Sequence, residues 1–140
     1  MTETMMRKRF KKVLKDTGVS FDQIETGITQ LGYPDIHFCA DPSISGWMEL
    51  KHVPSFKSGR VLIPWRPGQL TRGKMFVIAN INLWLCLLAD DTHIIRFIPG
   101  YNWAGNYSRV GLNGVTSYTF NIGRISFREL MRVLGKDQYA

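Results

Sequence analysis

Two acidic residues and a lysine are spaced so that neighbouring strands would bring their side chains together. Side chains two apart in a strand point to the same face, so Glu49 and Lys51 project together while Leu50 turns to the opposite face and packs. Asp35 opens the preceding predicted strand, and antiparallel neighbours lie about 5 Å apart. Asp35 and Glu49 are therefore placed to share one cation, with Lys51 beside them.

Such a cluster suits phosphate chemistry that depends on a divalent metal. Two carboxylates this close repel each other unless a hard cation lies between them, and Mg²⁺ prefers oxygen ligands. The metal would polarise a phosphoryl oxygen and activate a bound water, while Lys51 would orient the nucleophile or neutralise charge developing on phosphorus. The plainer interpretation is that Pro34 and Asp35 open a turn, and that Glu49 and Lys51 form an exposed cross-strand ion pair.

The surrounding residues predict the elements that would position this cluster. Four stretches have the alternating or continuously apolar character of strands, at 35–39, 47–53, 82–89 and 92–98. Turn formers at 40–46 make the first two strands a hairpin, and Asp90 and Asp91 form a second turn. Residues 54–66 are loop-like, and Pro67 would open a helix through about Ala79. The sheet therefore has at least four strands.

The N-terminal segment predicts an amphipathic helix at residues 3–16 with an apolar stripe and a strongly basic outer face. Gly18 would end this helix. The basic face is either a solvated face on a packed helix or a surface that contacts phosphate. Residues 21–31 fit a helix or a strand equally, so their structure stays open.

The C-terminal segment, residues 99–140, is rich in Gly, Asn and aromatic residues up to position 123, and Ser126 would cap a final helix ending near 134–135. Tyr101, Trp103 and Tyr107 could stack unpaired bases. Packing of these rings on the core or on a second subunit is the simpler interpretation.

The composition predicts one domain with a basic surface. The chain has 140 residues, of which 44% are apolar, and this length supports one core rather than two. Lys and Arg total 18 against 11 Asp and Glu, and the formal charge of +7 favours a polyanionic partner such as DNA or RNA. Cys39 and Cys86 lie among apolar neighbours without a C-x-x-C spacing, so we expect two buried reduced thiols in a cytosolic protein. We expect neither a secretion signal nor a membrane anchor.

Three motifs, in order along the chain, resemble those of the PD-(D/E)XK nuclease superfamily: GYPD at 32–35, GWMELK at 46–51 and RPGQ at 66–69. The likeness covers about residues 24–88 and is strongest to small phage-encoded nucleases of the VRR-NUC and Holliday-junction-resolvase-like type. It implies an α/β fold with a central mixed β-sheet flanked by helices, a restriction-endonuclease-like core at about 20–98 within a single domain. The implied activity is Mg²⁺-dependent endonucleolytic hydrolysis of DNA, with Mn²⁺ able to substitute, and the favoured role is resolving or nicking branched DNA.

The resemblance also implies a role for each matching residue. Asp35 and Glu49 would bind the metal, and the Leu50 carbonyl could add a ligand. Lys51 would assist the attacking water, and Gln69 would support the site from its helix.

An upstream acid is implied as well, for which Glu25 matches best and Glu3 is the weaker candidate. The residues expected to contact nucleic-acid phosphates are basic and are Arg7, Lys8, Arg9, Lys11, Lys12, Lys57, Arg60 and Arg66. Resolution of a symmetric junction would call for a homodimer with two active sites. The rival hypothesis is a non-catalytic nucleic-acid-binding or virion-associated protein that keeps the fold.

Two features depart from the resemblance or compete with it. The interval at 53–65 is longer than expected between the lysine strand and the glutamine helix, and the region after Pro99 matches no motif, so substrate choice could lie there. His37, His52 and His93 lack the spacing of metal ligands, and ordinary strand histidines explain them.

Overall fold

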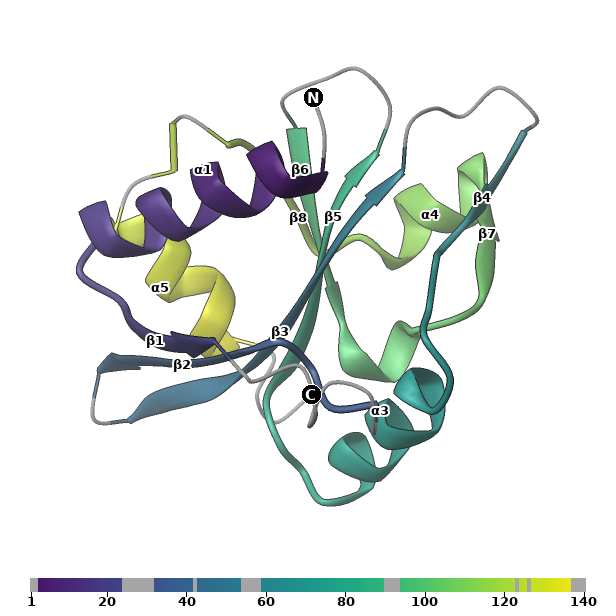
Figure 1. The fold of residues 1–140 in the computed structure, drawn as a ribbon, viewed down its shortest axis with the longest axis horizontal. Helices are drawn as coiled ribbons and strands as arrows, with labels where there is room; N and C mark the ends of the chain where they lie inside the picture. The colour runs from purple at the N-terminus through teal and green to yellow at the C-terminus, as the bar shows by residue number, and fades with distance from the viewer. Residues whose placement is uncertain are drawn as a thin grey trace.

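A mixed β-sheet runs through the middle of the molecule, with helices on both of its faces (Figure 1). The computed structural model describes residues 3–23, 32–41, 43–53, 59–89, 94–122, 124–125 and 127–136. Within these ranges six strands form the sheet, in the spatial order β1 (Ser20–Gln23), β2 (Ile36–Asp41), β3 (Ile44–Val53), β5 (Leu83–Ala89), β6 (Ile94–Pro99) and β8 (Tyr118–Asn121). The predicted α/β fold with a central mixed sheet is confirmed.

The central strands β3 and β5 are parallel, whereas the other neighbouring strands of this sheet are antiparallel. A parallel pair needs a crossover connection. Here the crossover contains strand β4 (Arg60–Leu62) and helix α3 (Gln69–Ile78). Strand β4 pairs with β7 (Asn106–Ser108) in a small second sheet. The crossover brings the first turn of α3 to the same side of β3 as Glu49.

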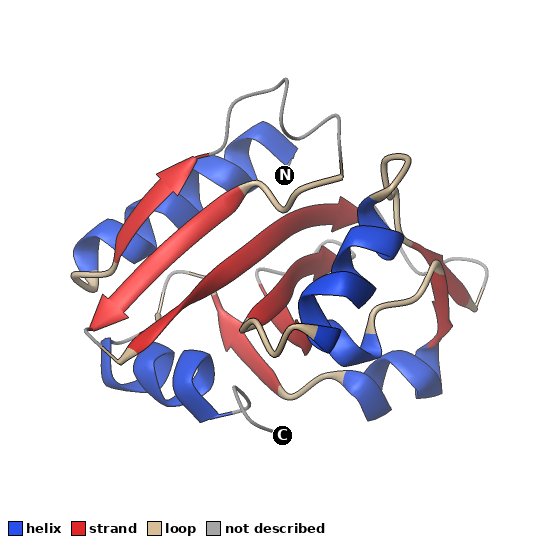
Figure 2. Ribbon diagram, turned by 90° about the horizontal axis from the view of Figure 1, so that it is seen from below, coloured by secondary structure: helices blue, strands red, loops and turns tan. Residues whose placement is uncertain are grey.

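One face of the large sheet is covered by α1 (Glu3–Asp16) and α5 (Phe127–Lys136), which lie together on the left of Figure 1. Figure 2 shows the twist of the long strands between the helices. The core on this face is built from large apolar side chains, including Met6, Phe10, Leu14, Phe38, Met48, Leu50, Trp84, Phe97, Leu130, Val133 and Leu134. Burial of this apolar surface is what holds both helices on the sheet.

The opposite face carries a smaller core beneath α4 (Arg109–Val115), the β4–β7 pair and the short 3₁₀ helix η1 (Gly100–Asn102). Its buried members are Val61, Ile63, Leu85, Leu87, Ile98, Tyr107 and Leu112. Strand β5 contributes Leu85 and Leu87 to this core and Trp84 and Cys86 to the other, as the period of two requires. Both faces of β5 are therefore buried.

The predicted N-terminal helix is confirmed, and its apolar stripe is buried. Met6, Phe10 and Leu14 are fully buried, and Gly18 follows the helix with a positive φ of 81°. That left-handed conformation is cheap for glycine, so the chain turns there into β1. In the part of the chain that the structure describes, no helix combines the length and the apolar character needed to span a membrane.

The hairpin differs from the prediction in where its second strand begins. β3 starts at Ile44 rather than at residue 47, and Gly46 lies inside it, opposite Phe38. A side chain at Gly46 would collide with Asn82, because its Cβ would lie 2.8 Å from the Asn82 Cβ. The glycine that the sequence placed in a turn instead allows close packing inside the sheet.

The connection between β3 and β5 also differs from the prediction. The interval predicted as loop contains β4, and α3 begins at Gln69 instead of at Pro67. Gly68 adopts a left-handed φ of 85° immediately before the helix. Pro67 and Gly68 therefore form a turn, and the helix that Pro67 was expected to open starts two residues later.

The structure resolves part of the segment that fitted either a helix or a strand, since 20–23 form β1. Residues 24–31, the Asp90–Asp91 turn, His93 and the Ser126 cap lie outside the described residues. After Pro99 the chain forms η1, β7, α4 and β8, none of which the sequence predicted. The prediction of two buried thiols is wrong for Cys39, which is exposed because Phe38 and Ala40 take the inward positions of β2, and right for Cys86.

Candidate active site

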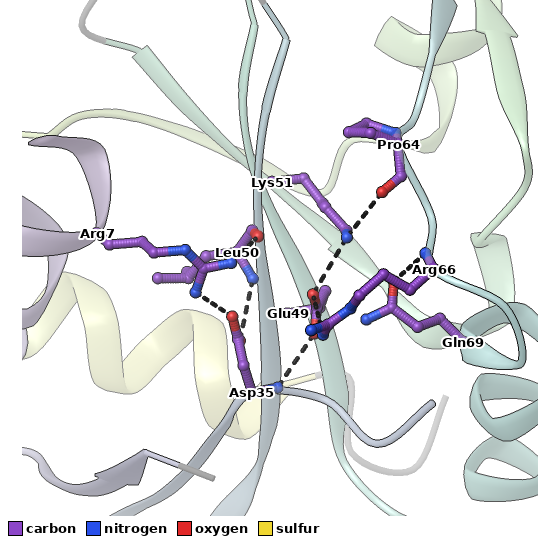
Figure 3. Close-up of polar contacts among 8 residues, drawn as sticks. All are labelled: Arg7, Asp35, Glu49, Leu50, Lys51, Pro64, Arg66 and Gln69. Carbon is purple, nitrogen blue, oxygen red and sulfur yellow. Dashed lines mark hydrogen bonds and ion pairs between the residues drawn. The ribbon is translucent and has the colours of Figure 1, made fainter. Parts of the chain in front are cut away.

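Asp35 and Glu49 meet at the end of the β2–β3 hairpin (Figure 3). Pairing of Ile36 with Met48 places Asp35 opposite Glu49. The Asp35 N–H donates to Glu49 Oε2 at 3.1 Å, and the Leu50 N–H donates to Asp35 Oδ1 at 3.3 Å. Asp35 is 4% exposed and Glu49 is fully buried. Each carboxylate is thus held by a main-chain N–H of the other strand, and the predicted convergence is found.

Lys51 and Arg66 lie on the other side of Glu49. Lys51 Nζ is 3.4 Å from Glu49 Oε1 and donates to the Pro64 carbonyl at 2.9 Å. Arg66 Nη2 is 3.5 Å from the same Oε1. Glu49 Oε1 accepts no hydrogen bond from the residues that the structure describes, although two cations lie within 4 Å. This oxygen is therefore available to a further ligand.

Burial shifts the pKa values of Glu49 and Lys51. The pKa of Glu49 is raised to about 7, mainly because burial removes the carboxylate from water and also because of the negative charge of Asp35, while Lys51 opposes the shift. Burial likewise lowers the pKa of Lys51, against the effect of Glu49. Two acids held this close in a dry environment favour the arrival of positive charge.

Gln69 is the first residue of α3 and lies next to Glu49, on the helix where the resemblance expected it. It is 1% exposed, and its Oε1 accepts the Arg66 N–H at 2.8 Å. Gly32, at φ 87°, packs directly on this turn, since a Cβ at Gly32 would lie 2.6 Å from the Gly68 carbonyl carbon. The glycines of the first and third motifs therefore bring two backbone turns into contact, which positions Gln69 and Arg66 beside Glu49.

Arg7 reaches the site from α1, which the sequence did not predict. Its Nη1 donates to Asp35 Oδ2, and its Nη2 donates to the Leu50 carbonyl at 3.1 Å. The sequence assigned Arg7 to the basic outer face. The available signal was its position next to Met6, at the border of the apolar stripe, where a long side chain can reach past the core.

The other predicted basic residues fall into separate places. Lys8 and Arg9 are exposed on α1, and Lys12 pairs with Asp16 at 3.0 Å. Arg60 is exposed and donates to Asn106 Oδ1 at 2.9 Å. The remaining candidates have these fates: Lys11 is half-buried on α1, Lys57 and Glu25 lie outside the described residues, and Glu3 is described only as the first residue of α1.

The aromatic residues after Pro99 mostly pack, as the simpler interpretation predicted. Trp103 lies against Trp65 with ring centroids 4.8 Å apart, and Tyr107 is buried with its hydroxyl donating to Asn102 O at 2.6 Å. Tyr101 is half-exposed. Lys51 Nζ lies 5.6 Å from the Trp65 ring centroid, so this packing also forms one wall of the site.

The donor set fits a hard cation. Asp35 Oδ2 and the Leu50 carbonyl already bind one positive group, the Arg7 guanidinium, and Glu49 Oε1 accepts no hydrogen bond from the described residues. Two carboxylates and a carbonyl suit Mg²⁺, which keeps several waters. In the described part of the chain, no three His, Cys, Asp or Glu side chains are grouped to hold a metal, so the carbonyl and water would complete the shell. The His37 ring packs on the Trp47 ring, with centroids 5.0 Å apart, as expected of a strand histidine.

A six-stranded mixed sheet in the described residues, with helices on both faces and a parallel central pair, defines a restriction-endonuclease-like α/β fold. Among solved structures, the fold matches Hjc of Archaeoglobus fulgidus, a Holliday junction resolvase from an archaeal hyperthermophile. The TM-score is 0.59 at 12% sequence identity, over 86% of this chain and 96% of that chain. No family model and no curated protein sequence matches the chain. The predicted likeness is thus confirmed for the fold.

Proposed function

We propose that this protein is a metal-dependent nuclease that hydrolyses phosphodiester bonds in DNA. The observation that carries the proposal is the convergence of Asp35, Glu49 and Lys51 beside a cationic pocket. That pocket has a volume of about 280 Å³ and is lined by Arg7, Lys51, Pro64 and Arg66. Cations in the pocket suit a phosphate, and the adjoining carboxylates suit a metal. The fold shared with a Holliday junction resolvase supports the same conclusion.

Each residue has a distinct part in this reaction. A bound Mg²⁺ would polarise the phosphoryl oxygen and lower the pKa of its water. Asp35, Glu49 and the Leu50 carbonyl would hold the ion. Lys51, anchored by the Pro64 carbonyl, would orient the attacking water and neutralise charge on the phosphorus oxygens. Arg66 would bind the same phosphate from the turn that Gln69 fixes.

The test is incubation of the protein with end-labelled four-way junctions, flaps, single strands and linear duplexes in Mg²⁺, with products mapped to the nucleotide. We expect cleavage by the wild type and none by Glu49→Gln. Asp16→Asn removes an exposed acid on α1 and serves as the control that should cleave normally. Binding of DNA without cleavage under any metal condition would instead establish the non-catalytic nucleic-acid-binding protein.

We further propose branched DNA as the preferred substrate, which the fold of the junction-resolving neighbour supports. Paired incisions in a symmetric junction require two active sites, so this substrate implies a two-fold homodimer. Light scattering with and without junction DNA would measure it. A monomer under both conditions would favour a nicking or flap-cleaving enzyme.

A further inference from the structure

Arg7 lies where the proposed metal ion would bind. Its guanidinium bridges Asp35 Oδ2 and the Leu50 carbonyl, two of the oxygens that the proposed function assigns to the metal (Figure 3). The second Asp35 oxygen accepts the Leu50 N–H. The Asp35 oxygen that would face the metal, Oδ2, is therefore already in contact with the Arg7 guanidinium.

We propose that Arg7 is a tethered competitor of the metal, which neutralises Asp35 in the metal-free protein and must leave before a divalent ion can bind. This inference rests on the proposed function, because it assumes that Asp35, Glu49 and the Leu50 carbonyl are the metal ligands. It adds that the site is closed to metal by one of the chain's own side chains.

The charges around the site show why both cations cannot stay. Asp35 and Glu49 carry at most two negative charges, and Arg7, Lys51 and Arg66 carry up to three positive ones. A divalent ion added to this cluster would meet an excess of positive charge at short range, in a buried setting that screens poorly. Displacement of Arg7 removes one positive charge and returns both oxygens to the ion.

The displaced guanidinium has a place to go. Arg7 lines the pocket that Lys51, Pro64 and Arg66 also line, and its side chain is 24% exposed, so rotation toward solvent needs no unfolding of α1. A DNA phosphate in this pocket would accept the guanidinium in a bidentate pair. Phosphate binding then releases Asp35 to the metal, so DNA and metal should each strengthen the binding of the other.

A purely structural role for Arg7 makes the opposite prediction. If the contact only fastened α1 to the hairpin, its loss would loosen the site, and metal affinity would fall or stay constant. If Arg7 competes with the metal, its loss should raise metal affinity although it removes a stabilising contact. The sign of the change separates the two roles.

The experiment is calorimetric titration of the whole chain with Mn²⁺ in the absence of DNA. We expect Arg7→Gln to bind Mn²⁺ at least about tenfold more tightly than the wild type, because a charge-assisted interaction no longer has to be broken. Arg7→Lys keeps the charge but cannot bridge both oxygens, so it should fall between them. Lys15→Gln removes an exposed charge from the last turn of the same helix and should match the wild type.

Thermal unfolding supplies a second measurement if Arg7→Gln folds weakly. Mn²⁺ should raise its melting temperature more than that of the wild type. If Asp35→Asn abolishes Mn²⁺ binding while Arg7→Gln and Arg7→Lys bind no more tightly than the wild type, the competition is refuted and the metal site stands. If neither the wild type nor any Arg7 variant binds Mn²⁺, the metal site of the proposed function fails as well.

Discussion

The two faces of strand β3 bury different kinds of side chain, which alternate along one short stretch: apolar side chains on one face and charged side chains on the other. Met48 and Leu50 face the core beneath α1 and α5, which is built from large apolar side chains whose burial stabilises the fold. Glu49 and Lys51 face the other way and are as deeply buried, but each requires charged or polar partners. Substitutions on the first face should lower stability, whereas the second face holds the charges that the proposed reaction uses.

The largest effect is expected from substitution of either carboxylate, Asp35 or Glu49. Glu49→Gln or Asp35→Asn should lower the cleavage rate by at least about a hundredfold, because a ligand of the proposed metal is lost. Affinity for DNA, measured in Ca²⁺, should be equal or higher, since a negative charge that repels phosphate is gone. Cleavage at the wild-type rate by both variants in Mg²⁺ would remove these residues from the reaction.

A pair of neighbouring substitutions sharpens the comparison between the faces. Lys51→Ala should reduce the cleavage rate by about a hundredfold or more with only a modest loss of DNA affinity, since the proposed role of Lys51 is at the reacting phosphate. Leu50→Ala should instead lower the free energy of unfolding by about 2–5 kcal/mol, because Leu50 is fully buried in the apolar core.

Denaturant melts and rate constants measured on both proteins would separate the two losses. A Lys51→Ala protein that cleaves normally, or a Leu50→Ala protein as stable as the wild type, would contradict the division between the faces.

The contact between Gly32 and Gly68, which positions Gln69, can be tested by comparing substitutions at Gly32 and at Gly59. Gly32→Ala and Gly59→Ala both place a side chain at positive φ, 87° and 78°, which costs about 1–2 kcal/mol of stability. Gly32→Ala adds a clash, with the Gly68 carbonyl carbon at 2.6 Å, whereas no atom of the described residues lies within 4 Å of a Cβ at Gly59. We expect the melting temperature to fall further for Gly32→Ala. Equal shifts in melting temperature would show that the turns at Gly32 and Gly68 can separate without cost.

The smallest effect concerns single basic residues on the outer surface. DNA affinity in Ca²⁺ should fall steeply as salt rises from low to roughly physiological concentration, because phosphate contacts release counterions. Lys8→Ala, exposed on α1, should reduce the slope of that dependence by about one contact and leave cleavage at saturating DNA unchanged. An affinity insensitive to salt would argue against phosphate contacts as the source of binding.

The sequence located the acid pair and Lys51 because their placement depends only on local geometry. A strand alternates with period two, and a hairpin brings consecutive strands together, so Asp35, Glu49 and Lys51 followed from spacing. Gln69 was predicted only from its motif, since nothing in the helical pattern shows which strand a helix start will face. Its position depends on the contact between Gly32 and Gly68, which are far apart in sequence.

Other features depended on packing between elements and could not be predicted locally. Arg7 contacts Asp35 only because α1 docks across the hairpin, a tertiary arrangement that a helical pattern does not specify. Strands β4 and β7 are three residues each, too short for alternation to stand out. Cys39 was predicted to be buried because its neighbours in the sequence are apolar. The period of two in β2, however, places its side chain on the face of the sheet opposite to that of Phe38.

The parallel pairing of β3 with β5 has a consequence for how the molecule folds. The β2–β3 hairpin joins segments close in sequence, so Asp35 and Glu49 can meet early, while β5 can join β3 only after β4 and α3 have crossed the sheet. Contacts of high sequence separation form late, so we expect the pairing of β3 with β5 to form after the hairpin. The carboxylates would then come together in water before the walls around them close, so the protein can fold without a metal to gather its acids.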